Sequence, residues 1–412
     1  MYMYRKFLLI FLYLYALIFS VSKTIRIPNQ WAQSHWLVDY KFGFIKRGLA
    51  GELFGFLFEK NTFTITILSI AILSVLYFLI IKIALTTTWS NPKSFYRILF
   101  FVIFLLSQYI VFSAHLIGYL DHIVFLLTIL AVYLIIKNKL FPASVIAVFS
   151  IFIHEISVVL MLPICCFAII VNQIPIKEFF IKDIFSRNIL NKLALFLTLP
   201  FFTAAFISFF QEISGGNYYT QLFSYLIQSS IPENVADSVC SAYTKSFTYY
   251  FGEQYDHFFQ RIFVSKATVF YGIPIVFLLW MNFKEFKLKE NIHLFIVLIL
   301  IAGVPLILHS IAYDTYRIWT FPYMILFLGF WILSLKYKAE SIQTKSEKLS
   351  WWEFLFFITA FLFITLVPAV LFDGETEKFS VIIKLILILP MVIILYFLKK
   401  KLQSKPTEAL LK

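Results

Sequence analysis

Long apolar runs dominate this sequence and constrain its fold more than any other feature. Stretches of about 18 to 20 residues recur along the chain, the length at which a helix spans the hydrocarbon layer of a bilayer. The 412 residues are 61% hydrophobic and only 14% charged, with 51 phenylalanines. A soluble protein could hardly bury that much apolar surface. The sequence therefore predicts an all-α, polytopic integral membrane protein.

We expect about twelve transmembrane helices in a single transmembrane domain over residues 1–412. The first run follows Arg5 and Lys6, but no small-residue cleavage site comes after it, so we interpret it as a retained helix and not a signal peptide. The long run at 140–174 is divided at His154 and Glu155, because a span should not carry that pair at mid-membrane. The predicted spans are 7–22, 63–85, 98–114, 119–136, 140–154, 156–174, 193–210, 267–282, 292–308, 318–335, 351–371 and 380–398.

The basic residues favour one orientation of these spans. With the N-terminus in the cytoplasm, 23 of the 35 Lys and Arg residues fall in inner segments and 12 in outer ones. Cytoplasmic loops carry such an excess, so we expect both termini inside, with 399–412 as a cytoplasmic tail. The same rule accounts for the net charge of +13, and no nucleic-acid partner is expected. Two long outer segments, 23–62 and 211–266, are expected to be functional insertions.

The outer segment "DYKFGFIKRGLAGEL" (39–53) concentrates charge beside the membrane. Lys46 and Arg47 are followed by Gly48 and Gly51. A guanidinium group binds phosphate through two parallel hydrogen bonds, and glycine lets a ligand approach the backbone closely. This pattern favours an anionic ligand such as a lipid phosphate. The alternative is a solvated loop that contacts lipid headgroups.

Other ionisable residues also fall at predicted outer helix ends, and they are Asp121, His122, His154, Glu155, His309, Asp314 and Arg317. Such residues within apolar spans cost roughly 2.5–3.5 kcal/mol each, and they generally face a bundle interior or a cavity. Asp314 and Arg317 are spaced for pairing on a helical turn. His154 and Glu155 would point about 100° apart on a helix, so only one of them is expected to face a cavity.

These residues form a one-sided set, because the inner ends of the spans carry almost nothing comparable. A transporter should instead show polar groups near mid-membrane and a path to both sides. The pattern therefore predicts an active site open to the outer leaflet. Structural ion pairs and interfacial caps are the alternative interpretation for each member of the set.

Several chemistries are excluded by motif. "HEISV" lacks the second histidine of HExxH, and the chain has no GxSxG, P-loop or dinucleotide fingerprint. The three cysteines form no CxxC pair. Histidines and carboxylates could together hold a divalent cation, but no spacing specifies one, so the metal and any cofactor stay open.

The polytopic N-in chain, with an acidic first outer loop and polar outer turns, resembles the GT-C class of membrane glycosyltransferases. The resemblance implies a GT-C-like bundle in the bacterial cytoplasmic membrane, a polyprenyl-linked sugar donor and a glycan or lipid acceptor. It implies Asp39 as catalytic base, with Glu52 a weaker candidate and Asp121 or Glu155 in reserve. Lys46, Arg47 and Arg317 would contact phosphate. Of the set above, His122, His154 and His309 would orient substrate groups.

The chain also resembles Wzy-type O-antigen or capsule polymerases, which have functional arginines and a large outer loop. That resemblance implies that residues 211–266, with His257 and Arg261, correspond to this large outer loop. Both resemblances imply glycosyl transfer from an undecaprenyl-linked donor during surface polysaccharide assembly. The competing hypothesis is a lipid-linked oligosaccharide flippase or permease, for which twelve spans are typical.

Overall fold

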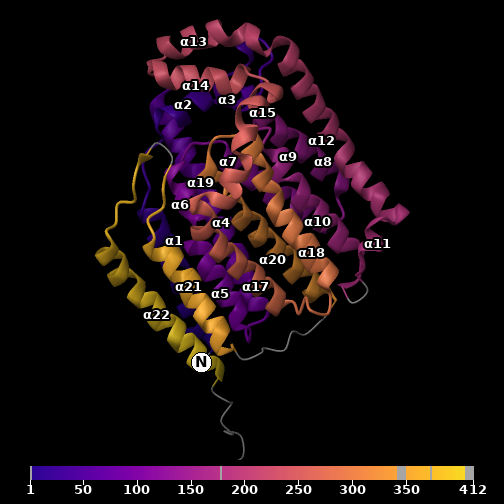
Figure 1. The fold of residues 1–412 in the computed structure, drawn as a ribbon, viewed down its shortest axis with the longest axis vertical. Helices are drawn as coiled ribbons and strands as arrows, with labels where there is room; N and C mark the ends of the chain where they lie inside the picture. Colours follow the sequence, from indigo (N-terminus) through magenta and orange to yellow (C-terminus); the bar gives the residue numbers. More distant parts are fainter. Residues whose placement is uncertain (1, 177–178, 341–348, 372–373, 404–412) are drawn as a thin grey trace, which may run out of the picture.

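The computed structural model describes residues 2–176, 179–340, 349–371 and 374–403, and every regular element in these ranges is helical. The predicted all-α class is therefore confirmed. The helices, in chain order (Figure 1), are α1 (Tyr2–Ser22), α2 (Gln30–Leu37), η1 (Tyr40–Phe42), α3 (Gly48–Leu57), α4 (Thr62–Ser90), α5 (Phe95–Leu106), α6 (Gln108–His115), α7 (Asp121–Ile136), α8 (Leu140–Ile153), α9 (Ser157–Leu160), α10 (Leu162–Gln173), α11 (Ile181–Ile184), α12 (Arg187–Ser214), η3 (Gly215–Tyr218), α13 (Tyr219–Gln228), α14 (Glu233–Thr244), α15 (Phe247–Gln254), η4 (Tyr255–His257), η5 (Gln260–Val264), α16 (Lys266–Phe270), α17 (Gly272–Glu285), α18 (Ile292–Gly303), η6 (Val304–Ser310), α19 (Thr315–Ile318), α20 (Phe321–Ala339), α21 (Trp351–Leu366) and α22 (Val381–Gln403).

Eight helical stretches in the described ranges are long and apolar enough to cross a membrane. They are Tyr4–Ser22, Thr62–Ser90, Phe95–His115, Arg187–Ser214, Lys266–Glu285, Ile292–Ser310, Thr315–Ala339 and Val381–Lys400. Each coincides with a predicted span. The polytopic membrane class therefore agrees with the structure.

The other four predicted spans correspond to shorter apolar helices, which are α7, α8, α9 with α10, and α21. At 1.5 Å per residue, the 14 residues of α8 reach about 21 Å, less than the roughly 30 Å of a hydrocarbon layer. Each of these helices is too short to be assigned as a membrane span from its length. The number twelve stays a prediction.

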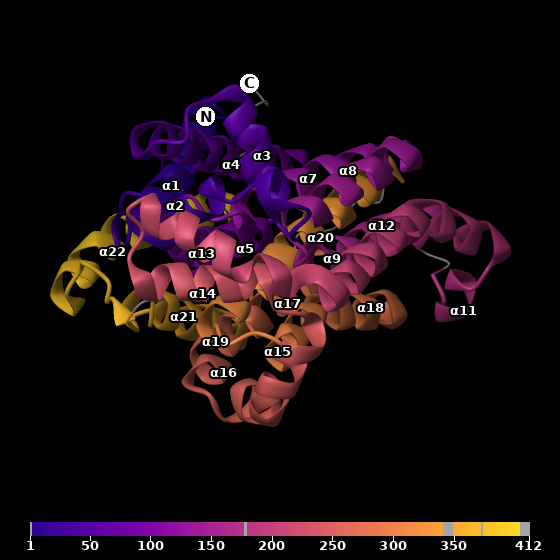
Figure 2. The ribbon, with the colours of Figure 1, turned by 90° about the horizontal axis from the view of Figure 1, so that it is seen from above.

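The two ends of the bundle differ. The N-terminus and the end of α22 lie at one end, while α2, α3, α13, α14 and α15 lie at the other (Figure 1). Seen from above, α13 and α14 lie across the end of the bundle (Figure 2). The segments 23–62 and 211–266 thus fold into helices that cover one end. Of the predicted tail, residues 404–412 lie outside the described residues.

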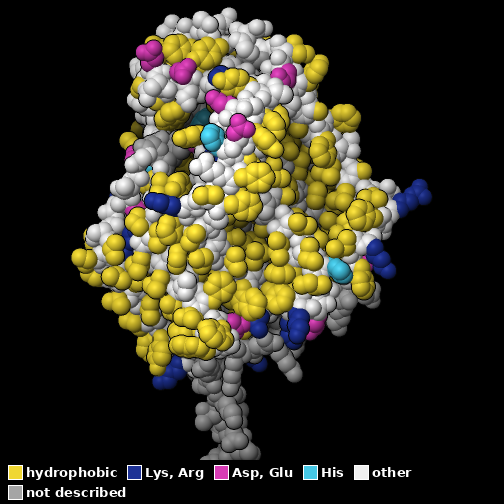
Figure 3. Space-filling model, viewed as in Figure 1, with side chains coloured by type: hydrophobic (Ala, Val, Ile, Leu, Met, Phe, Trp, Pro, Cys, Tyr) yellow, Lys and Arg dark blue, Asp and Glu magenta, His cyan; other side chains and the backbone are white. Residues whose placement is uncertain are grey.

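Two helical stretches form the centre of the bundle. The whole apolar window of Phe95–His115 is buried, and 89% of that of Thr315–Ala339 is buried. Phe100 stacks on Phe330, and Phe104 on Phe327, at ring-centroid distances of 4.1 and 4.3 Å. On the face shown in Figure 3, apolar side chains cover the middle and charged ones lie mostly toward the ends. Because lipid tails are as apolar as the core, close packing and not water exclusion holds such helices together.

The end that holds the termini contains buried charge that the sequence interpretation missed. Arg97 donates from Nε to Glu285 at 2.5 Å and from Nη1 to the Thr87 carbonyl at 2.6 Å. Lys284 lies 3.2 Å from Glu353, which is also buried. The expectation that the inner ends carry almost nothing comparable was wrong. These pairs tie α5, α17 and α21 together.

Candidate functional site

A cavity of about 660 Å³ lies at the end of the bundle opposite the termini. Polar side chains reach it from α2, from the turn before α3, from the break between α8 and α9, from α14 and α15, and from the turn before α19. Those that the argument uses are His35, Lys46, Arg47, Tyr119, His154, Glu155, Asp314 and Arg317. Six of these eight had been predicted from sequence as site residues.

A break in the helical backbone brings both His154 and Glu155 to the cavity. Helix α8 ends at Ile153, and His154 has an extended backbone with φ −159° and ψ 121°. The Ser157 hydroxyl donates to the His154 carbonyl at 2.8 Å and stabilises the break. Because the two residues are not consecutive positions of one helix, the expectation that only one of them faces the cavity was wrong.

Arg47 stands at the start of α3 in the left-handed backbone region, with φ 63°. The glycines after it serve packing. A Cβ on Gly51 would lie 1.9 Å from the Val38 carbonyl oxygen, and one on Gly48 would lie 2.6 Å from the Tyr40 ring. These two glycines let the Val38 backbone and the Tyr40 ring pack closely against α3, and it is not a ligand that approaches them.

Two arginine–carboxylate groups lie in this region of the protein. Arg47 binds Glu155 side-on, with Nε donating to Oε1 at 3.0 Å and Oε2 at 2.8 Å, and with Nη2 also on Oε1. Arg317 binds Asp121 through Nε at 2.9 Å and Nη2 at 2.7 Å, and donates from Nη1 to Asp314 at 3.1 Å. The Asp314–Arg317 pairing expected from the spacing is present.

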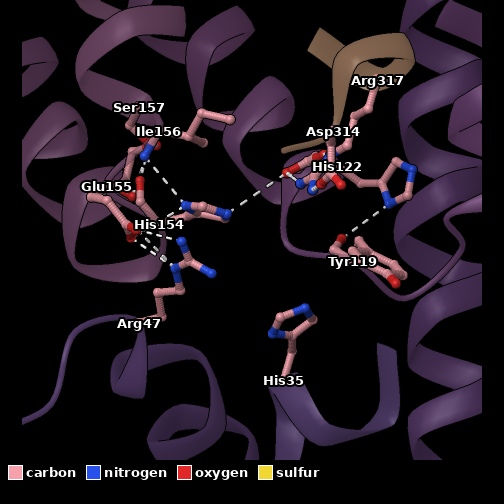
Figure 4. Close-up of polar contacts among 12 residues, drawn as sticks. His35, Arg47, Tyr119, His122, His154, Glu155, Ile156, Ser157, Asp314 and Arg317 are labelled. Carbon is pink, nitrogen blue, oxygen red and sulfur yellow. Dashed lines mark hydrogen bonds and ion pairs between the residues drawn. The ribbon is translucent and has the colours of Figure 1, made fainter. Parts of the chain in front are cut away.

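His154 lies between the two groups (Figure 4). Its Nδ1 is 3.3 Å from Oε2 of Glu155, and its Nε2 is 4.0 Å from Oδ1 of Asp121. The backbone N–H of Ile156 donates to the same Nδ1 at 3.2 Å. One imidazole thus lies between two carboxylates that each bind an arginine.

The electrostatics of the site follow from burial and from Arg47. Burial would raise the pKa of the Glu155 carboxyl, but Arg47, with help from His154, holds that pKa well below its usual value. Burial and the same Arg47 charge lower the pKa of His154. Burial also lowers the pKa of Lys46 to about 8, although Glu155 opposes the shift. Glu155 is therefore ionised, and His154 is neutral at pH 7.

Asp39 and Glu52 lie outside this cavity, in a separate surface depression. Asp39 pairs with Lys60 and accepts from the Lys41 backbone N–H at 3.1 Å, capping η1. Glu52 accepts from the Tyr40 backbone N–H at 3.2 Å. The structure does not bring either carboxylate to the arginines or to His154.

Two predicted histidines are buried beside the cavity and do not line it. The ring nitrogens of His122 lie 2.9 Å from the Ser113 carbonyl and 3.1 Å from the Tyr119 carbonyl. His122 borders a space of about 20 Å³, enough for one water, together with Asp121. The His309 backbone carbonyl accepts from Arg261 at 3.2 Å.

The outer segment 211–266 supplies part of the cavity wall through α14 and α15. Ser241, Tyr250 and Gln254 are among its lining residues. Arg261 holds Gln254 by donating to its side-chain oxygen at 2.7 Å, while His257 is exposed at the surface. Helices α14 and α15 of this segment thus line the cavity, which no motif had indicated, and its functional importance stays a prediction.

The sequence interpretation missed His35 and Tyr243. A hydrogen bond of 2.8 Å joins His35 Nδ1 and the Tyr243 hydroxyl, and both side chains are buried. The histidine of "WAQSHWLVDY" (31–40), which stands among aromatic residues, was the available signal.

In the residues that the structure describes, no three His, Cys, Asp or Glu side chains are grouped so that they could hold a metal ion. Two of the carboxylates that line the cavity, Glu155 and Asp314, instead bind arginines. Comparison of the chain with protein-family models, curated proteins and solved structures finds no match to any of them.

Proposed function

We propose that this protein is a glycosyltransferase of the bacterial cytoplasmic membrane. It transfers sugar from a polyprenyl-phosphate- or pyrophosphate-linked donor to a glycan or lipid hydroxyl, in a GT-C-like bundle whose cavity faces outward. The observation that carries the proposal is the Arg47–Glu155 pair in the wall of a 660 Å³ cavity, with Lys46 beside it and His154 within 3.3 Å of the carboxylate.

Charge divides the cavity into two arms. Arg47 pairs with one carboxylate, Glu155, and Lys46 lies beside them, so this group carries one more positive than negative charge. Asp237 and Glu253 also line the cavity, from α14 and α15, outside this ion pair. Arg317 faces two carboxylates, Asp121 and Asp314, which leaves one surplus negative charge. A donor phosphate is attracted to the first arm, and Arg317 serves to hold Asp121 behind His154.

Glu155 occupies the groups of Arg47 that a phosphate would bind. A carboxylate and a phosphate both accept two parallel hydrogen bonds from a guanidinium. The Glu155 side chain is 35% exposed, against 12% for Asp121, and so it is the carboxylate with room to leave. Once a phosphate replaces it, Glu155 loses the charge that holds its pKa down and becomes a better base.

The reaction then balances as follows. Glu155 accepts the proton of the acceptor hydroxyl, whose oxygen attacks the anomeric carbon of the sugar. The bond from that carbon to the phosphate oxygen breaks, and its electron pair stays on the departing lipid phosphate, which Arg47 and Lys46 stabilise. His154 shares the proton, because an imidazolium there lies between Glu155 and Asp121.

The test is to delete the gene in its host and to examine surface polysaccharide on gels after complementation. Glu155→Gln and Arg47→Ala should each reduce product, by about 10²–10⁴-fold for loss of the base. Asp39→Asn should leave the product near wild type, because Asp39 lies outside the cavity. Loss of product in Asp39→Asn with retention in Glu155→Gln would assign the base to Asp39 instead. An unchanged profile in the deletion strain would contradict the proposal.

The same gel tests a polymerase as the second candidate. The contribution of α14 and α15 to the cavity wall favours it, because an acceptor chain must enter past the segment 211–266. Single repeat units in place of a ladder would identify a polymerase. A ladder lacking one sugar per repeat would identify a transferase acting on the lipid-linked unit.

A further inference from the structure

One imidazole contacts the aromatic supports of both cavity arginines. The ring of His35 meets Tyr119 edge-on at 5.2 Å and stacks on Tyr243 at 5.8 Å, where it also makes the 2.8 Å hydrogen bond to the hydroxyl. Arg47 lies over the Tyr243 ring at 5.7 Å, and Arg317 lies over the Tyr119 ring at 5.6 Å. The two guanidinium groups are therefore linked through three rings in contact, one pair edge-on and one pair stacked.

The supports are themselves fixed. Gln211 donates to the Tyr243 carbonyl at 3.0 Å, and Trp36, next to His35, donates from its indole to the Gly118 carbonyl at 2.8 Å. Tyr243 is fully buried, and His35 is 9% exposed. The two rings and the arginines that lie over them thus form one packed group.

We infer that His35 is a positioning residue that holds Arg47 toward a phosphate in the cavity and holds Arg317 on Asp121. The inference rests on the proposed function, since it names what holds the phosphate-binding arm in place. His35 itself donates no charge to the ligand. It acts through Tyr243 on Arg47 and through Tyr119 on Arg317.

The chemistry of histidine fits this role. The contact needs a flat ring for two tyrosines and a hydrogen-bonding atom at the Nδ1 position. Burial, together with the charge of Arg47, keeps the pKa of His35 well below its usual value. The ring therefore stays neutral and does not repel the guanidinium groups.

Three substitutions separate the contribution of the His35 ring from that of its hydrogen bond to Tyr243. His35→Phe keeps a ring and removes Nδ1, His35→Asn keeps a hydrogen-bonding atom near that position and removes the ring, and Tyr243→Phe removes only the hydroxyl. Tyr13→Phe is the matched control, because the Tyr13 hydroxyl is equally buried and makes a 2.8 Å hydrogen bond to Thr88 elsewhere in the bundle. Thermal unfolding of each variant in lipid nanodiscs checks that the fold is retained.

The measurement is the Kd for inorganic pyrophosphate, with the KM for donor and for acceptor alongside it. We expect His35→Phe and Tyr243→Phe each to weaken pyrophosphate binding about tenfold, or about 1.4 kcal/mol. The double variant should be no weaker than either one, because both break the same bond. The donor KM should rise while the acceptor KM stays unchanged, and Tyr13→Phe should bind like wild type. His35→Asn should weaken binding as well, through loss of the ring.

The outcomes distinguish the inference from the function on which it rests. If wild type binds pyrophosphate, Arg47→Ala does not, and the His35 and Tyr243 variants bind like wild type, the positioning role is wrong and the proposed function stands. If wild type binds no pyrophosphate, the phosphate-binding arm is wrong and the inference falls with it. Equal rises in both KM values would show a general structural effect and would also overturn the positioning role.

Discussion

At the scale of the residue, the charge of Lys46 changes near pH 8. Burial lowers the pKa of its ammonium group to about 8, so Lys46 is charged below that pH and neutral above it. Because a phosphate ligand needs the charge, we predict that pyrophosphate affinity falls as pH rises through about 8. Titration calorimetry between pH 6.5 and 9.5 measures this.

Lys46→Arg is the control for that titration. Arginine stays protonated throughout the range, so the variant should lose the alkaline decrease. Pyrophosphate itself also titrates, but equally for both proteins. Parallel pH profiles for wild type and Lys46→Arg would contradict a role for Lys46 in binding.

At the scale of the element, the packing of α3 decides where Arg47 stands. The residues 23–62 had been treated as one loop, but α2 and α3 fold there, and α3 lies directly on the backbone at Val38. Gly51 makes that approach possible, since an added Cβ would fall 1.9 Å from the Val38 oxygen. Hydropathy could not reveal this helix, because its ten residues are too short for a span.

We predict that Gly51→Ala destabilises the protein by about 1–3 kcal/mol, the usual cost of overpacking, and lowers transfer because Arg47 moves with α3. Gly55→Ala on the same helix is the matched control. Its Cβ would meet the end of the flexible Lys60 side chain, at 2.5 Å, which can move away. Thermal unfolding in detergent and the pyrophosphate Kd report the two effects. Equal unfolding temperatures for both variants would show that the Val38 contact does not matter.

At the scale of the whole molecule, the cavity and the termini lie at opposite ends of the bundle. With the N-terminus inside, the cavity faces out. We therefore predict that Glu59→Cys reacts with a membrane-impermeant maleimide in intact cells, whereas Lys139→Cys reacts only after permeabilisation. Both positions are exposed. Glu59 lies just before the start of α4, and Lys139 lies just after the end of α7.

The labelling background is a variant with the native cysteines replaced by alanine, since the chain has free thiols at positions 165, 166 and 240. Labelling of both positions in intact cells would indicate that the maleimide has entered the cells, and the experiment would be repeated at a lower maleimide concentration. Labelling of Lys139→Cys alone would reverse the orientation, and a site that uses donors from the outer leaflet would then be contradicted.

The sequence by itself determined the helical membrane class, the positions of the long spans and most of the cavity's charged residues. Helix length and hydropathy are local properties, and ionisable residues beside apolar runs are visible without any knowledge of contacts. Only the tertiary structure decided which of those residues meet. Glu155 lies 108 residues from Arg47, Arg317 lies 196 from Asp121, and Tyr243 lies 208 from His35. No local periodicity encodes such pairings, so Asp39 looked the better base until packing placed it against Lys60, outside the cavity, and placed Glu155 beside Arg47.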